Sequence, residues 1–139
     1  MWGCPLIVIT VIFHVLGLEA IRPRAIAVHN NLRKRGHPIA SSAAVIGAAT
    51  LLATMLHGIE ATIWATTYVF IGSLHDPRSA MLYSLGALTT YGHQSVYLED
   101  RWRLLGALEA LDGWLLFGLS TAFLFWLMQA VSPKNHADN

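Results

Sequence analysis

Charged side chains are scarce in this sequence. Asp, Glu, Lys and Arg together make up 12% of its 139 residues, while hydrophobic residues make up 55%. Soluble domains carry about 25% charged residues, so this deficit excludes a protein whose surface faces water over most of its area. The net charge is only +1, and five of the nine Lys and Arg residues lie in one short stretch, Arg22–Arg35. This argues against a nucleic-acid partner, because such binding needs an extended basic face.

Cysteine is almost absent as well. The single thiol, Cys4, excludes an internal disulfide and any zinc site built from several cysteines, and we expect it to be inert. No charged side chain occurs from Met1 to Leu18, whereas a secretory signal normally starts with Lys or Arg and ends at a small-residue cleavage site. We therefore interpret this segment as a retained helix. No run has Arg at every third position, which excludes a voltage sensor.

Long apolar runs dominate what is present. The first run, Pro5–Ile21, rises about 25 Å as a helix, which is near the lower limit for crossing a bilayer. The second run, Ile39–Leu74, contains Glu60 as its only charged residue, and the third run is Leu104–Val131. The pattern predicts an all-α membrane protein with three transmembrane helices, followed by a polar tail over residues 132–139.

Five basic residues and no acid separate the first run from the second. Lys and Arg concentrate on the cytoplasmic side of membrane proteins, so we expect this stretch to form a cytoplasmic loop. The N-terminus then lies outside and the C-terminus inside, in a plasma (inner) membrane. Residues 1–38 would form an N-terminal unit of one helix and one basic loop. The five residues are Arg22, Arg24, Arg33, Lys34 and Arg35.

The segment Ser79–Leu98 is uncharged but rich in polar residues and glycine. Such backbone is tolerated at membrane depth only where it is buried in protein or lines water, so we expect this segment to re-enter the membrane from the outer face. Asp76 and Pro77 suit the N-cap and the first position of a short helix over residues 77–88. Residues 89–95 would follow as an extended loop. Residues 39–131 then form one pore-loop domain.

This loop resembles the selectivity filter of the potassium-channel superfamily, whose pattern is Thr-Thr-x-Gly-Tyr-Gly-Asp. Here it consists of Thr89, Thr90, Tyr91, Gly92, His93, Gln94 and Ser95. The segments Trp102–Ala110 and Leu116–Phe125 resemble the inner helix of small bacterial two-helix pore proteins of that superfamily. The segment His57–Glu60 and Trp64 resemble their outer helix, and an extra N-terminal helix also occurs in such proteins.

The resemblance implies a homotetramer around a central pore, with outer helix 39–74, pore helix 77–88, filter loop 89–95 and inner helix 104–131. Monovalent cations, K⁺ or Na⁺, would bind at Thr90, Tyr91 and Gly92, and no cofactor is implied. Gln94 and Ser95 replace the second glycine and the aspartate of the family pattern. Because Gln94 adopts filter geometry only at the cost of backbone strain, we expect weak discrimination between the two ions.

Four ionisable residues form two pairs in the second and third predicted spans. His57 and Glu60 are three residues apart and share a helix face, as do Glu109 and Asp112. Each pair is interpreted either as filter support or pore electrostatics, or as a hydrogen-bonded structural group. A metal site formed by all four is the least favoured alternative, since only one histidine has ligand spacing. His14, in the first run, is interpreted as a hydrogen-bonded core residue.

The sequence therefore predicts an ion-channel subunit that conducts cations passively through a non-standard filter. It predicts no enzyme, and the partners are membrane lipid and further copies of the same chain. The alternative is a non-conducting membrane scaffold or auxiliary subunit with a channel-like fold. A membrane metalloenzyme is a third hypothesis.

Overall fold

A computed structural model describes residues 3–36, 38–92 and 96–132. These ranges contain four α-helices, a one-turn helix over Asp100–Trp102, and no β-strand. The helices are α1 (Gly3–Arg33), α2 (Pro38–Phe70), α3 (Pro77–Leu88) and α4 (Arg103–Val131). Within the described residues, three long helices have the length and apolar composition needed to cross a membrane. The prediction of an all-α protein with three candidate spans is therefore confirmed.

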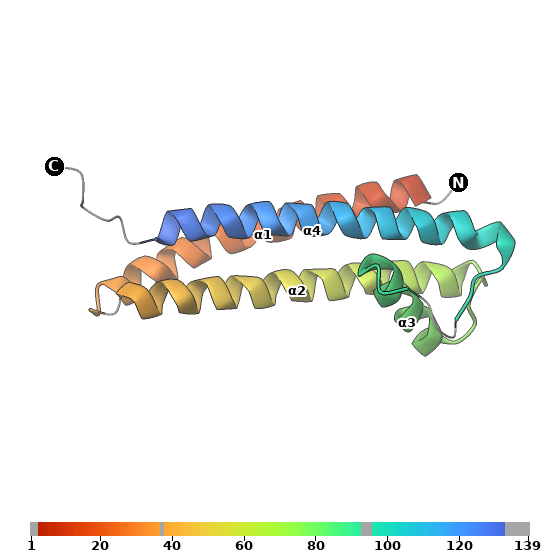
Figure 1. Cartoon of the computed structure of the whole chain (residues 1–139), viewed down its shortest axis with the longest axis horizontal. Coiled ribbons are helices and arrows are strands. Elements are labelled where there is room, and N and C mark those ends of the chain that lie inside the picture. The colour runs from red at the N-terminus through yellow and green to blue at the C-terminus, as the bar shows by residue number, and fades with distance from the viewer. Residues whose placement is uncertain (1–2, 37, 93–95, 133–139) are drawn as a thin grey trace.

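The three long helices lie side by side, and α3 packs at one end of the bundle (Figure 1). α1 contacts both α2 and α4, while α3 contacts α2 and α4. The turn between α1 and α2 lies at one end of the bundle together with the C-terminus (Figure 1). The N-terminus, the α2–α3 connection and the start of α4 lie at the other end. This arrangement leaves α3 beside only one half of the bundle.

The first helix is longer than the sequence predicts. α1 continues to Arg33 with Pro23 inside it, so most of the predicted basic loop is helical and only Lys34–Gly36 form the turn. Proline removes one backbone hydrogen bond, but membrane helices tolerate it because other groups compensate. The Arg22 guanidinium lies 4.2 Å from the centre of the Trp126 ring on α4. This contact holds the basic end of α1 against the last turns of α4.

The short helix α3 has the predicted bounds. The Asp76 carboxylate accepts hydrogen bonds from the backbone N–H and the hydroxyl of Ser79, at 2.9 and 2.7 Å, and Pro77 opens the helix. Because these bonds favour the ionised carboxylate, they lower the pKa of Asp76 below its ordinary value. The Asp76 cap and Pro77 thus fix the N-terminus of α3, and both can be recognised in the sequence.

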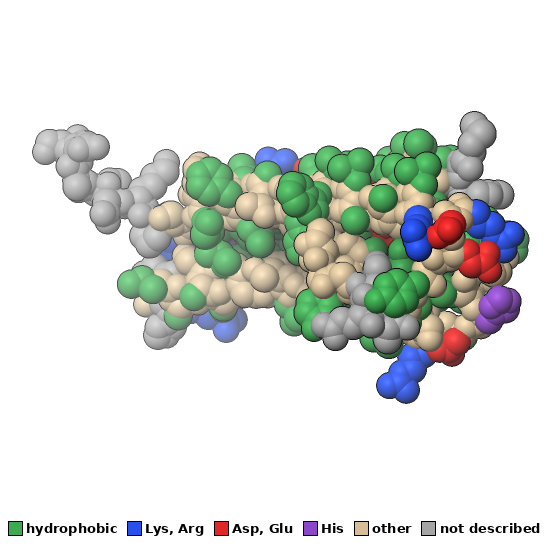
Figure 2. Space-filling model, turned by 45° about the vertical axis from the view of Figure 1, so that its right-hand side comes forward, with side chains coloured by type: hydrophobic (Ala, Val, Ile, Leu, Met, Phe, Trp, Pro, Cys, Tyr) green, Lys and Arg blue, Asp and Glu red, His purple; other side chains and the backbone are tan. Residues whose placement is uncertain are grey.

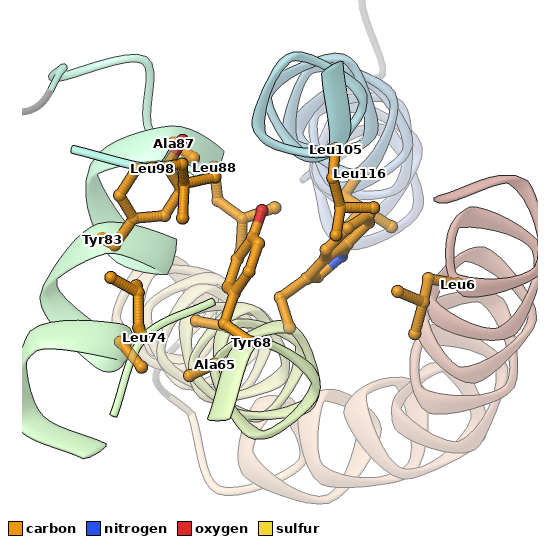
Figure 3. Close-up of a cluster of buried hydrophobic side chains, with 13 residues drawn as sticks. Leu6, Ala65, Tyr68, Leu74, Tyr83, Ala87, Leu88, Leu98, Leu105 and Leu116 are labelled. Carbon is orange, nitrogen blue, oxygen red and sulfur yellow. The ribbon is translucent and has the colours of Figure 1, made fainter. Parts of the chain in front are cut away.

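Aromatic and aliphatic side chains fill the space between α2, α3 and α4. Tyr68 on α2 and Leu116 on α4 are fully buried there, and Leu88 at the end of α3 belongs to the same cluster (Figure 3). α3 approaches α4 closely because Gly113 lacks a side chain. A Cβ built on Gly113 would lie 2.1 Å from the carbonyl oxygen of Leu88. The end of α3 therefore packs directly on the backbone of α4.

The flank of the bundle is apolar. Figure 2 shows hydrophobic side chains over the flank, while charged side chains gather at the end that holds α3 and the start of α4. The large exposed hydrophobic residues come from all four helices, and Phe70, Leu82, Trp114 and Phe125 are among them. Such a surface fits contact with lipid or with other subunits.

Candidate functional site

The polar loop that follows α3 is the first candidate. The Gly92 N–H donates to the carbonyl of Gly86 at 3.2 Å and folds the chain back over the end of the helix. Thr90 and Gly92 both have positive φ, at 56° and 85°, a region that β-branched residues such as threonine rarely adopt. Residues 89–92 are exposed in the single chain. The predicted filter residues His93, Gln94 and Ser95 lie outside the described residues.

The second candidate is a cluster between α1, α2 and α4. The Glu60 carboxylate lies 2.7 Å from Nδ1 of His14 and 3.3 Å from Nδ1 of His57. The Ser120 hydroxyl oxygen lies 3.0 Å from Nε2 of His14 and 3.1 Å from Nε2 of His57. We call these four side chains the histidine–glutamate ring. His14 and Glu60 are fully buried, while the His57 side chain is 16% exposed.

Asp112 lies beside the histidine–glutamate ring. One of its carboxylate oxygens accepts hydrogen bonds from the Thr10 hydroxyl at 2.7 Å and from the Trp64 indole N–H at 2.9 Å. Asp112 is fully buried and interacts electrostatically with Glu60 and His14. Since its partners come from α1 and α2, this carboxylate ties α4 to both other spans.

Glu109 forms a third polar contact, closer to α3. Its carboxylate accepts a hydrogen bond from the Tyr68 hydroxyl at 2.8 Å, and it is fully buried. Ser84, on α3, is buried beside the same carboxylate, and Tyr83 interacts with it electrostatically. An intramembrane acid is costly unless it faces a partner or water, and here each of the buried acids Glu60, Glu109 and Asp112 has a partner on a neighbouring helix.

The ionisable residues predicted on the second and third spans lie in the interior of the helix bundle. His57 and Glu60 share a contact, as their spacing predicts, and Glu109 and Asp112 point towards α1 and α2 inside the chain. The sequence interpretation missed the partners on other helices. A usable signal existed at helical spacing, because polar groups recur four residues apart at Thr10 and His14 in an otherwise apolar run. The remaining missed partners are Tyr68 and Ser120.

The group of possible metal ligands also differs from the group of four residues that the sequence suggests. Among the described residues, His14, His57 and Glu60 offer ligand atoms that all lie within 4.8 Å of one another. The second imidazole comes from α1, whereas the sequence interpretation counted one histidine and added two acids from the last span. Two imidazoles and one carboxylate are donors that a transition-metal ion accepts.

Comparison of the chain with protein-family models, with curated proteins and with solved structures finds no match to any of them.

Proposed function

We propose that the chain is a subunit of a homo-oligomeric pore that conducts monovalent cations past the loop 89–95. One observation carries this proposal. A helix too short to cross a membrane packs between two spans and ends in exposed polar backbone with positive φ at Thr90 and Gly92. The C-terminal end of a helix carries a partial negative charge, which favours a cation at the start of this loop.

The position of the loop along the bundle supports the proposal. The end of α3 packs against Gly113, about 15 Å along α4 from its start at 1.5 Å per residue. α3 begins, capped by Asp76, after the α2–α3 connection, which lies at one end of the bundle (Figure 1). A short helix that packs beside two spans at this depth and then turns back is the arrangement expected of a re-entrant segment.

The exposure of the loop supports an oligomer. Polar, non-helical backbone is not tolerated against lipid hydrocarbon, yet residues 89–92 are exposed in the single chain. Neighbouring copies that cover the loop would resolve this conflict and would enclose a polar axis. The exposed apolar side chains of α3 and α4 at Leu82, Leu85 and Trp114 supply surface for such contacts. The family resemblance makes four the expected number of subunits.

The flux test uses two glycines that differ in backbone conformation alone. Gly92 has φ +85°, whereas Gly58 lies within α2, and a Cβ built on either would meet nothing within 4 Å. Alanine at position 92 is strained by about 1–2 kcal/mol in the left-handed region, and alanine at position 58 is a better helix former than glycine. We therefore expect Gly92→Ala to reduce cation flux at least tenfold in liposomes, and Gly58→Ala to conduct as the wild-type chain does.

Purified wild-type protein should carry both K⁺ and Na⁺ down their gradients, with modest preference between them. An intact oligomer that carries neither ion would contradict the pore and favour the scaffold or auxiliary subunit. A stable monomer in lipid would contradict it as well, because one loop per chain encloses no axis. Equal flux in both glycine variants and the wild-type chain would show that the loop backbone does not line the ion path.

The proposed orientation rests on the basic end of α1. Residues Arg22–Arg35 contain five basic residues and no acid, so this end is expected in the cytoplasm. Asn30 and His75 are both exposed. Asn30 lies near the end of α1 and His75 in the α2–α3 connection, and these two segments lie at opposite ends of the bundle (Figure 1). In a Cys4→Ser background, His75→Cys should react with an impermeant thiol reagent in intact cells. Asn30→Cys should react only after permeabilisation, and the reverse pattern would overturn the orientation.

A further inference from the structure

We propose that His14, His57 and Glu60 form a binding site for a divalent first-row transition-metal ion between the spanning helices. The proposal is independent of the pore, because it concerns residues buried inside one chain. The two imidazoles come from α1 and α2, and both turn Nδ1 towards the same carboxylate. Imidazole and carboxylate donors suit zinc and its first-row neighbours, whereas calcium and magnesium prefer oxygen-only sites.

The distances require little movement. Donor atoms around a tetrahedral zinc ion lie about 3.3 Å apart, given bonds of about 2.0–2.1 Å. The two nitrogen–oxygen separations are 2.7 and 3.3 Å, and all three donors lie within 4.8 Å of one another. The ring centres of His14 and His57 are 5.0 Å apart and tilted by 40°. To hold a zinc ion, the donor atoms would therefore have to move only by the difference between their present separations and about 3.3 Å.

Ser120 gives the site the outer contacts that metal-bound histidines usually have. A metal-ligating imidazole generally donates its other ring N–H to an oxygen, which fixes the ring orientation. With Nδ1 of both rings on the metal, both Nε2 atoms carry hydrogen, and both lie within hydrogen-bond distance of the Ser120 oxygen. A hydroxyl oxygen has two lone pairs, so it accepts both bonds. The hydrogen-bonding capacity of the two rings is then fully used.

The charges also balance inside the membrane. A divalent ion with ionised Glu60 leaves one positive charge, and Asp112, which interacts electrostatically with Glu60 and His14, supplies one negative charge. One oxygen of Asp112 has no hydrogen-bond partner among the described residues, so its charge is incompletely compensated without an ion. His57 is the partly exposed residue of the site, with 16% of its side chain exposed, and its ring stacks on Phe117 at 4.5 Å between centres. We expect an ion to enter on the side of His57.

The binding test uses the full chain, purified with an affinity tag that contains no histidine, stripped with chelator and titrated with Co²⁺ and then Zn²⁺. We expect one equivalent of Co²⁺ per chain, visible d–d absorption, and displacement by Zn²⁺. His14→Asn and Glu60→Gln should weaken binding more than 100-fold. Ser120→Ala should weaken it about 10–100-fold, as loss of an outer-shell contact does.

The matched control is His29→Asn. His29 is also a buried histidine of α1 with a serine partner, Ser41 at 3.4 Å, but it has no place in the group of metal donors. This variant should bind Co²⁺ as the wild-type chain does. Retained binding in both ligand variants, or equal loss in the His29 control, would overturn the site.

A second measurement needs no substitution and covers the case in which a ligand variant does not fold. Pulsed electron paramagnetic resonance of Cu²⁺ bound to the wild-type chain counts coordinated imidazoles, and we expect two. No coordinated imidazole, or wild-type metal content near zero after titration, would leave the histidine–glutamate ring as a hydrogen-bonded cluster and contradict the proposal. Cation flux plays no part in either readout, so failure of the metal site is distinguishable from failure of the pore.

Discussion

Replacing Gly113 with alanine is expected to lower the free energy of unfolding by about 3 kcal/mol, at the upper end of the usual cost of overpacking. The added Cβ would lie 2.1 Å from the Leu88 carbonyl oxygen and 2.8 Å from the Leu88 Cα. Both neighbours are backbone atoms, so no side-chain rotation relieves the clash. The end of α3 would have to move away from α4, and the polar loop would move with it.

The matched control is Gly118→Ala, the same substitution five residues further along α4. Gly118 lies on an exposed part of α4, and a Cβ built there would meet nothing within 4 Å. Gly118→Ala should therefore stabilise the chain by about 0.5–1 kcal/mol, because alanine is the better helix former. Thermal or denaturant unfolding of both variants in the same detergent measures the difference. Equal stabilities would mean that α3 does not approach α4 as closely as the structure has it.

Local signals explain why the elements were predictable. The long apolar runs located the three long helices, and the Asp76–Pro77 pair located the start of α3. The exception is the stretch after Ile21, where the sequence predicts a basic loop. Proline stops helices in water because its lost hydrogen bond is not replaced locally, but the flanking residues here continue α1 to Arg33.

The contacts between helices were not predictable in the same way. His57 and Glu60 lie three residues apart on one helix, so their contact follows from helical spacing alone. The contacts of Glu60 with His14 and of Asp112 with Thr10 depend on how each helix is rotated about its axis. Helices that are apolar on most sides give little sequence signal for that rotation, and the spacing of Thr10 and His14 marks a polar face on α1 alone. The ring therefore became visible only in three dimensions.

The burial of Glu109 leads to the second large effect. Tyr68→Phe removes the hydrogen bond that the Tyr68 hydroxyl donates to the Glu109 carboxylate. Leaving a buried acceptor unpaired costs about 1–3 kcal/mol, and more for a charged group. We therefore expect Tyr68→Phe to lower the free energy of unfolding by about 3 kcal/mol, because Glu109 and Tyr68 are both fully buried. Tyr97→Phe, at a side chain that is 74% exposed, makes the same chemical change and should have almost no effect.

A double-mutant cycle separates the bond from its surroundings. Glu109→Leu removes the buried acid. In the Tyr68→Phe background this substitution should lower the free energy of unfolding less than it does in the wild-type chain, because two apolar groups then replace both partners. The coupling energy should lie at about 1–3 kcal/mol, the range for contacting residues. Unfolding midpoints of the four chains give this value, and additive effects would show that the hydroxyl and the carboxylate do not meet. Coupled loss would show that the Glu109 carboxylate joins α4 to α2 through the Tyr68 hydroxyl.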